Sequence, residues 1–338
     1  EDAAIGTSWI KDWDPDDRVY RDRREDNDEL TIWDDFTPGR YKDPYANILR
    51  VDAVDGSPIA LVVTFGIHGT IGGGDNPLWS NDSTGGLTTV LQEEFDEPVV
   101  VMHMQGAGGD ASPAGRDHEF ARAESIGHYA VDALIQAWEE TPTSSEPFQM
   151  ETASRHISQR HEDIRVTRDG AVDWYYRPFE EGYQADDQIY DANGDILSPI
   201  DEYNAKYGAA FCGSDAPLIP VGNIGSQVFP YSACMDVELM AGVIAGTFKM
   251  PVEEFPLPMP ESLGAGTTAS LLGPIPTRTP EGEVVDRELL VGFFPAEPTA
   301  MYSEQWRRRS LAELGVEMPL LVGYAQDHEG YFLIPEDW

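Results

Sequence analysis

Two apolar runs constrain the fold of this chain more than any other feature. Residues 59–67 and 98–104 are short, nearly continuous apolar stretches. Runs of this length are typical of strands that are covered by other layers on both faces. Between them, residues 84–95 show the apolar spacing of a helix. A buried strand, a helix and a second buried strand in this order predict a layered α/β core.

The rest of the chain supplies further elements for this core. We expect strands at 46–56, 149–157, 288–294 and 318–323, and helices at 119–139, 237–248 and 300–314. Residues 1–45 are interpreted as irregular, and the many prolines of 251–280 predict a surface crossover. Arg307, Arg308 and Arg309 are expected to solvate a helix face. The predicted fold class is α/β, a layered mixed β-sheet core flanked by helices.

The charge balance excludes several classes of partner. The 338 residues include 61 acidic and 22 basic side chains, for a net charge of -39. Nucleic acid binding needs clustered basic residues, so no nucleic acid partner is expected. No run of 18 or more apolar residues occurs, which predicts that this is not an integral membrane protein. Only 4 of the basic residues are Lys. That composition fits either a saline habitat or an ordinary acidic secreted enzyme.

The chain contains two cysteines, Cys212 and Cys234, on either side of a loop rich in Pro, Gly and Ser. A disulfide there would close a floppy segment and would indicate an oxidising compartment. Two buried free thiols are the alternative. With the disulfide, we expect a bacterial protein that is secreted, periplasmic or on the cell surface.

Two polar side chains follow the buried strands directly. His68 stands where the first strand meets the Gly-rich residues 69–75, and Ser112 lies in Gly-Gly-Asp-Ala-Ser-Pro at 108–113. Strand ends are where α/β folds place catalytic groups, and glycines let the backbone approach a substrate. A structural His and a Ser that caps a turn are the alternatives. The Ser window is neither a hydrolase nucleophile elbow nor a phosphate loop.

Glu297 follows the predicted strand 288–294, where it could bind a metal or cap the next helix. Tyr324, His328 and Tyr331 crowd the last predicted strand end, where they could also be core aromatics. The sequence has no compact metal motif of the His-Glu-x-x-His or Cys-x-x-Cys kind. Any metal site would therefore combine distant parts of the chain.

Taken together, these windows resemble the neutral/alkaline non-lysosomal ceramidase family. The matching windows are Phe-Gly-Ile-His-Gly-Thr at 65–70, Ser-Asn-Asp-Ser-Thr-Gly at 80–85, Gly-Asp-Ala-Ser-Pro at 109–113, Glu-Pro-Thr at 297–299 and Gly-Tyr-Phe at 330–332. The resemblance implies that His68, Glu297 and Tyr331 bind one catalytic zinc ion. It also implies that Ser112 is the nucleophile, with Asp110 as a catalytic residue beside it.

The same resemblance implies a set of substrate contacts. Arg23, with Arg24 as the alternative, matches an Arg that contacts substrate in the family. Gly69, Asp82 and Gly109 match the substrate and oxyanion loops. The implied reaction is hydrolysis of a lipid-like N-acyl amide, most simply ceramide to fatty acid and sphingoid base, with zinc-activated water as the base.

Two alternatives to ceramide hydrolysis stay open. A related zinc and Ser amidase or esterase could act on a non-ceramide N-acyl substrate, which the polar insert at 186–201 would favour. A non-catalytic secreted binding module with a degenerate site is the second alternative.

The resemblance covers most of 5–338, with loosely matching inserts in 145–290. The family carries a further zinc His in an upstream His-x-His-Ser/Thr-Gly-Pro window and an immunoglobulin-like C-terminal domain, and neither is found in this sequence. We therefore expect residues 1–338 to be the central and C-terminal part of one catalytic domain. Another polypeptide segment is expected to complete that domain and to supply the further His ligand.

Overall fold

The structure is a computed structural model that describes residues 3–22, 42–72, 79–158, 264–326, 330–332 and 334, together with the backbone of four short strands between 165 and 198. Several sequence predictions lie outside these residues: Arg23, Arg24, Cys212, Cys234, His328 and the helix expected at 237–248. The chain divides into two compact units. The first comprises Glu1–Arg155 and Gly266–Asp337, and the second comprises His156–Ala265 with Trp338.

The first unit is built on an eight-stranded mixed sheet with the order β15-β13-β12-β1-β3-β4-β5, and β7 also pairs with β12. Its strands are β1 (Ala3–Lys11), β3 (Tyr45–Ala53), β4 (Pro58–Phe65), β5 (Val100–Gln105), β7 (Gln149–Ser158), β12 (Gly264–Arg278), β13 (Val284–Phe293) and β15 (Leu320–Val322). The helices are α1 (Asp82–Glu93), α2 (Glu119–Glu140) and α5 (Ala300–Leu314). These bounds confirm most of the strands and helices expected from the sequence.

Four shorter strands form small ladders in this unit. They are β2 (Tyr20–Asp22) with β6 (Ala111–Pro113), and β14 (Glu297–Pro298) with β16 (Tyr331–Phe332). In the second unit, β8 (Arg165–Arg168) pairs with β9 (Ala171–Tyr175), and β10 (Ile189–Tyr190) pairs with β11 (Ile196–Ser198). Among the described residues, no helix is long and apolar enough to cross a membrane.

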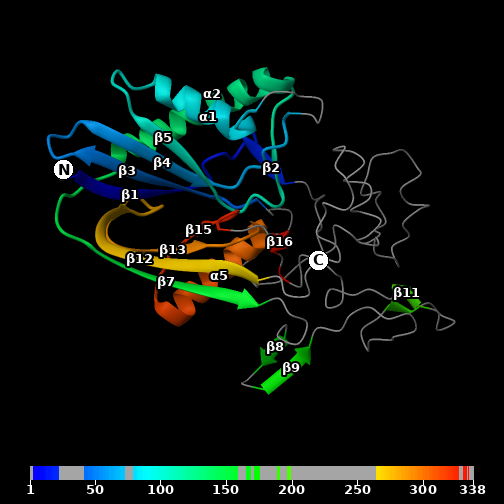
Figure 1. The fold of residues 1–338 in the computed structure, drawn as a ribbon. Helices are drawn as coiled ribbons and strands as arrows, with labels where there is room; N and C mark the ends of the chain where they lie inside the picture. Colours follow the sequence, from blue (N-terminus) through cyan, green and yellow to red (C-terminus); the bar gives the residue numbers. More distant parts are fainter. Residues whose placement is uncertain are drawn as a thin grey trace, which may run out of the picture. The chain divides into compact units, whose positions relative to one another are not determined.

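The two apolar runs form β4 and β5, which lie parallel in register from Ala60 opposite Val100 to Phe65 opposite Gln105. Helices α1 and α2 cover one side of these strands (Figure 1). The apolar side chains between helices and sheet include several that are almost fully buried, among them Leu61, Val63, Leu87, Leu91, Ile126 and Leu134. Burial of each such side chain contributes about 1.5–3 kcal/mol to the free energy of folding. This explains why the strands and helices around α1 and α2 match the apolar pattern of the sequence so closely.

A second hydrophobic core lies between β15 and β5, the first and last strands in the sheet order. Its buried members come from β1, β12, β13 and β15, and Met104 of β5 packs against them. Gly323, just after β15, donates its N–H to Gln105 O at 2.8 Å. The sheet therefore folds over on itself, and the carboxyl ends of β5 and β15 meet.

Two predictions about this sheet are wrong. Residues 1–45 were expected to be irregular, but β1 is a central strand, antiparallel to β3 along its full length and parallel to β12. Its buried positions include Thr7 and Ser8 in place of aliphatic residues, and Thr7 Oγ1 donates to Ile48 O at 2.8 Å. The proposed crossover at 251–280 contains β12, whose pairing with β13 shifts register between Leu272 and Ile275. A register irregularity is where a strand tolerates proline.

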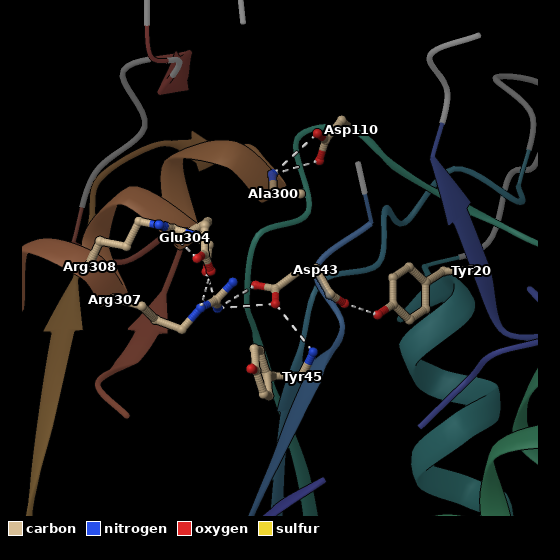
Figure 2. A network of polar contacts seen from close by, with 9 residues as sticks. Tyr20, Asp43, Tyr45, Asp110, Ala300, Glu304, Arg307 and Arg308 are labelled. Atoms are coloured by element: carbon tan, nitrogen blue, oxygen red, sulfur yellow. Dashed lines mark hydrogen bonds and ion pairs between the residues drawn. The ribbon is translucent and has the colours of Figure 1, made fainter. Parts of the chain in front are cut away.

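The helix α5 is anchored by a buried ion pair that the sequence analysis missed. Arg307 was expected to be solvated, yet it is 8% exposed. Its Nη1 lies 3.1 Å from a carboxylate oxygen of Asp43, its Nε donates to Glu304 at 3.0 Å, and its guanidinium lies over the Tyr45 ring (Figure 2). Of its neighbours, Arg308 is partly buried and Arg309 is exposed. The hydrophobic pattern could not show this, because the partners of Arg307 are themselves charged.

Candidate functional site

His68 is held rigidly just beyond the end of β4. The side-chain amide of Gln105 on β5 spans the backbone of Ile67: its oxygen accepts from Ile67 N at 2.9 Å and its nitrogen donates to Ile67 O. His68 N donates to Ala111 O at 2.8 Å, and Ser83 Oγ donates to His68 O at 2.9 Å. The imidazole is therefore presented from a backbone that three neighbouring segments fix in place.

Glu297 meets His68 in the interior. The Nε2 atom of His68 lies 3.2 Å from Oε2 of Glu297, and the two residues are 8% and 9% exposed. The same Nε2 is 3.3 Å from Gly109 O. Glu297 belongs to β14, and its N–H donates to Gly330 O at 2.8 Å. Two sequence-predicted metal ligands from opposite ends of the chain thus lie side by side.

A second histidine, the partly buried His103, shows what a structural His looks like in this fold. Its Nε2 donates to Phe65 O at 3.0 Å, and its ring packs edge-on against the Phe65 ring. Burial lowers the pKa of His103 to about 4, so its imidazole is neutral. His68 differs because its ring nitrogen faces a carboxylate.

Ser112 lies on β6, one residue after the carbonyl that accepts from His68 N, and its side chain is partly buried. Strand β6 is antiparallel to β2, with Arg21 opposite Ser112. In the turn before β6, Gly109 N donates to Pro298 O at 2.9 Å. The Ser112 segment is thus joined by backbone hydrogen bonds to both the His68 and the Glu297 segments.

Asp110 makes its described contacts with the start of α5. Both of its carboxylate oxygens accept from Ala300 N, at 3.0 and 3.2 Å, and the residue is 8% exposed (Figure 2). A negative charge at a helix N-terminus is stabilised by the helix dipole. These contacts make Asp110 a link between the Ser112 turn and the segment that carries Glu297. Its catalytic role stays a prediction.

Two tyrosines approach Glu297. Tyr331 on β16 is the register partner of Glu297 on β14, and it is 42% exposed. Tyr324, which the sequence analysis left open as a core aromatic, forms a side-chain hydrogen bond with Glu297. Burial raises the pKa of Tyr324 well above its usual range, and the hydrogen bond to Glu297 and the charge of Glu297 raise it further. In the sequence, the position of Tyr324 directly after a predicted strand was the feature that pointed to a role in the site.

Asp82 orders the loop that follows His68. Its carboxylate accepts backbone N–H groups from Ile71 at 2.9 Å, Gly72 at 2.7 Å and Ser83 at 2.7 Å. A Cβ added at Gly69 would lie 3.6 Å from the Cβ of Asp82, which is an ordinary contact. The predicted substrate loop is therefore built on the Asp82 carboxylate, and its role toward a substrate stays a prediction.

Gly109 is expected to tolerate no side chain. A Cβ there would lie 2.7 Å from Glu297 O and 3.2 Å from Cδ1 of Tyr331. Gly109→Ala should push the Ser112 turn away from Glu297 and lower the free energy of unfolding by about 1–3 kcal/mol. Gly266→Ala is the matched control, because a Cβ there meets only Gln326 Oε1 at 3.8 Å. Urea unfolding of both variants tests this, and equal free energies of unfolding would contradict it.

The His68 and Glu297 pair matches the spacing of zinc ligands. Donors at zinc distances of about 2.0–2.2 Å in a tetrahedral site lie roughly 3.3 Å from each other. The observed separation of Nε2 and Oε2 is 3.2 Å. Within the described part of the chain, no three His, Cys, Asp or Glu side chains converge as a metal-binding group.

Comparison with solved structures identifies the architecture. The neutral ceramidase of Pseudomonas aeruginosa aligns over 99% of this chain and 47% of its own length, with a TM-score of 0.55 and 16% identity. The chain has the fold of neutral ceramidase. A structure of a ceramidase complexed with C2 aligns over 99% of this chain and 48% of that chain, with a TM-score of 0.57 and 16% identity. No family model and no curated protein matches the sequence.

These alignments confirm the predicted fold class of a mixed α/β sheet flanked by helices. The chain spans about half the length of the ceramidases that it matches. At 16% identity the likeness establishes the fold alone.

Proposed function

We propose that this chain carries most of the active site of a zinc-dependent hydrolase that cleaves the amide bond of ceramide or of a similar N-acyl lipid. The observation that supports this best is the buried His68–Glu297 pair at 3.2 Å, with Ser112 next to the residue that accepts from His68 N. A metal-ligand pair beside a serine on a neutral ceramidase fold favours acyl transfer through an activated hydroxyl.

In this proposal, His68, Glu297 and Tyr331 hold the zinc ion. Bound there, zinc supplies a Lewis acid and lowers the pKa of a coordinated water. The same proposal includes a further His ligand from outside this chain; with a coordinated water as well, the zinc would be five-coordinate. The predicted substrate contact of Arg23 belongs to the same proposal.

The nucleophile in this proposal is Ser112. Its Oγ attacks the carbonyl carbon of the N-acyl group, the C–N bond breaks, and the amine leaves with a proton. The acyl group then forms an ester with Ser112, and water hydrolyses it to the fatty acid. The N–H of Gly109 is engaged by Pro298 O. Gly109 therefore serves the reaction by letting the Ser112 turn lie close to Glu297 and Tyr331.

The reaction is tested with a panel of N-acyl substrates and the protein that contains this chain. Ceramides of several acyl lengths should release fatty acid, a chelator should stop the release, and added zinc should restore it. His68→Ala should lose bound zinc, which elemental analysis measures independently of activity. His103→Gln is a control, because His103 contacts backbone and an aromatic ring.

Each other outcome identifies an alternative. Inert ceramides with hydrolysis of other amides or esters would favour a non-ceramide hydrolase. No hydrolysis and no zinc in the wild-type protein would favour a binding module with a degenerate site.

A further inference from the structure

We propose that Tyr324 is a positioning residue that orients the Glu297 carboxylate for metal binding by donating its phenol hydroxyl to it. This inference rests on the proposed zinc site. It adds a residue that the ceramidase-like windows did not include, since those windows place the phenol ligand at Tyr331.

The backbone at Tyr324 and after it is hydrogen-bonded to the segment that leads to Glu297. Tyr324 N donates to Ala296 O at 2.8 Å, and Ala325 N donates to Phe294 O at 2.9 Å. On the other side, Gly323 N donates to Gln105 O. Three consecutive residues are thus tied to the strand ends that surround the site. These hydrogen bonds fix the backbone of Tyr324 next to the residue that precedes Glu297.

Tyr324 also adopts a disfavoured backbone conformation. Its φ is +54°, in the left-handed region that bulky residues rarely occupy. Such a conformation is strained and persists only where the surroundings hold it. Here it accompanies a hydrogen bond between the phenol and Glu297. The strain is therefore located at the residue that contacts the proposed ligand.

A neutral phenol suits this role. One oxygen of Glu297 faces His68 Nε2 at 3.2 Å. A carboxylate that binds a metal is usually oriented by a hydrogen bond from a neighbouring group, and loss of that neighbour weakens metal binding about 10–100-fold. Tyr324 can supply this bond from its hydroxyl proton. The two tyrosines then have separate tasks: Tyr331 binds the metal and Tyr324 orients Glu297.

The test is a zinc titration of the protein that contains this chain, in competition with a chelator of known affinity. Tyr324→Phe removes only the hydroxyl and should weaken zinc binding about 10–100-fold. Tyr302→Phe is the matched control, because Tyr302 packs against Phe294 and Phe332. Its zinc affinity should equal that of the wild type. Thermal melting of both variants reports whether the fold is retained.

A second variant covers the case in which Tyr324→Phe is poorly folded. Tyr324→Asn also lacks the phenol, but asparagine tolerates positive φ, so it relieves the backbone strain and should still bind zinc more weakly. Wild-type zinc affinity in a folded Tyr324 variant would overturn this assignment alone. A wild-type protein that binds no zinc would overturn the proposed function and this assignment together.

Discussion

Ser112→Ala is expected to abolish hydrolysis of N-acyl amides and to leave zinc binding unchanged. If Ser112 forms the acyl-enzyme, its loss removes a covalent route that nothing in the variant replaces. Removing a nucleophile of this kind lowers kcat by on the order of 10³-fold or more. Zinc binding should persist, because Ser112 lies on β6 and the predicted ligands lie on the segments that follow β4, β13 and β15.

Fatty acid release and zinc content are measured on the same preparation. Ser125→Ala is the control, since Ser125 Oγ donates to Arg122 O within α2. Mass spectrometry of the wild-type protein with a slow substrate should find the acyl group on the peptide that contains Ser112. Turnover by Ser112→Ala within a few fold of wild type would show that another group is the nucleophile.

Arg307→Met is expected to cost about 3–5 kcal/mol of the free energy of unfolding. It removes the cation that faces Asp43 in the interior and leaves that carboxylate, 9% exposed, without its charge partner. Arg308→Met is the comparison, because Arg308 is partly exposed and its pair with Glu304 at 2.7 Å should be worth about 0–1 kcal/mol.

Urea unfolding of the two variants measures this difference, with equal m-values as the condition for comparison. Asp43→Leu combined with Arg307→Met should recover part of the loss, since exchange of both buried charges for apolar groups costs far less than breaking the pair. Similar losses in Arg307→Met and Arg308→Met would show that the buried pair does not anchor α5.

The sequence predicted those parts of the fold in which regularly spaced apolar side chains form the core. The strands and helices around α1 and α2 are of this kind. It failed where polar side chains are buried. Thr7 and Ser8 are buried in β1, where Thr7 Oγ1 donates to Ile48 O, and Arg307 is buried beside Asp43. The partners of these buried polar side chains lie far away in the sequence, so no local sequence pattern predicts their burial.

Only some residues of the candidate site could be predicted from the sequence. Family-like windows pointed to His68 and Glu297, which the structure brings to within 3.2 Å. No motif marked Gln105, which clamps the backbone before His68, and Tyr324, which contacts the Glu297 carboxylate, was named only as a possible core aromatic. Such supporting residues are recognised by the residues they contact. Those contacts become visible only when the positions of the strand ends in space are known.

The sheet joins parts of the chain that are far apart in sequence, and the candidate site forms between two of them. His68 and Glu297 lie on opposite sides of residues 156–265, so they come together only after a long stretch of chain has been closed into a loop. Closing such a loop costs entropy that grows slowly with its length. The pairing of β7 with β12 closes it within the sheet, where Ser154 Oγ lies 2.9 Å from Thr268 Oγ1. In the proposed zinc site, a metal ion bound by both His68 and Glu297 would stabilise the state in which the two ends of this loop are joined.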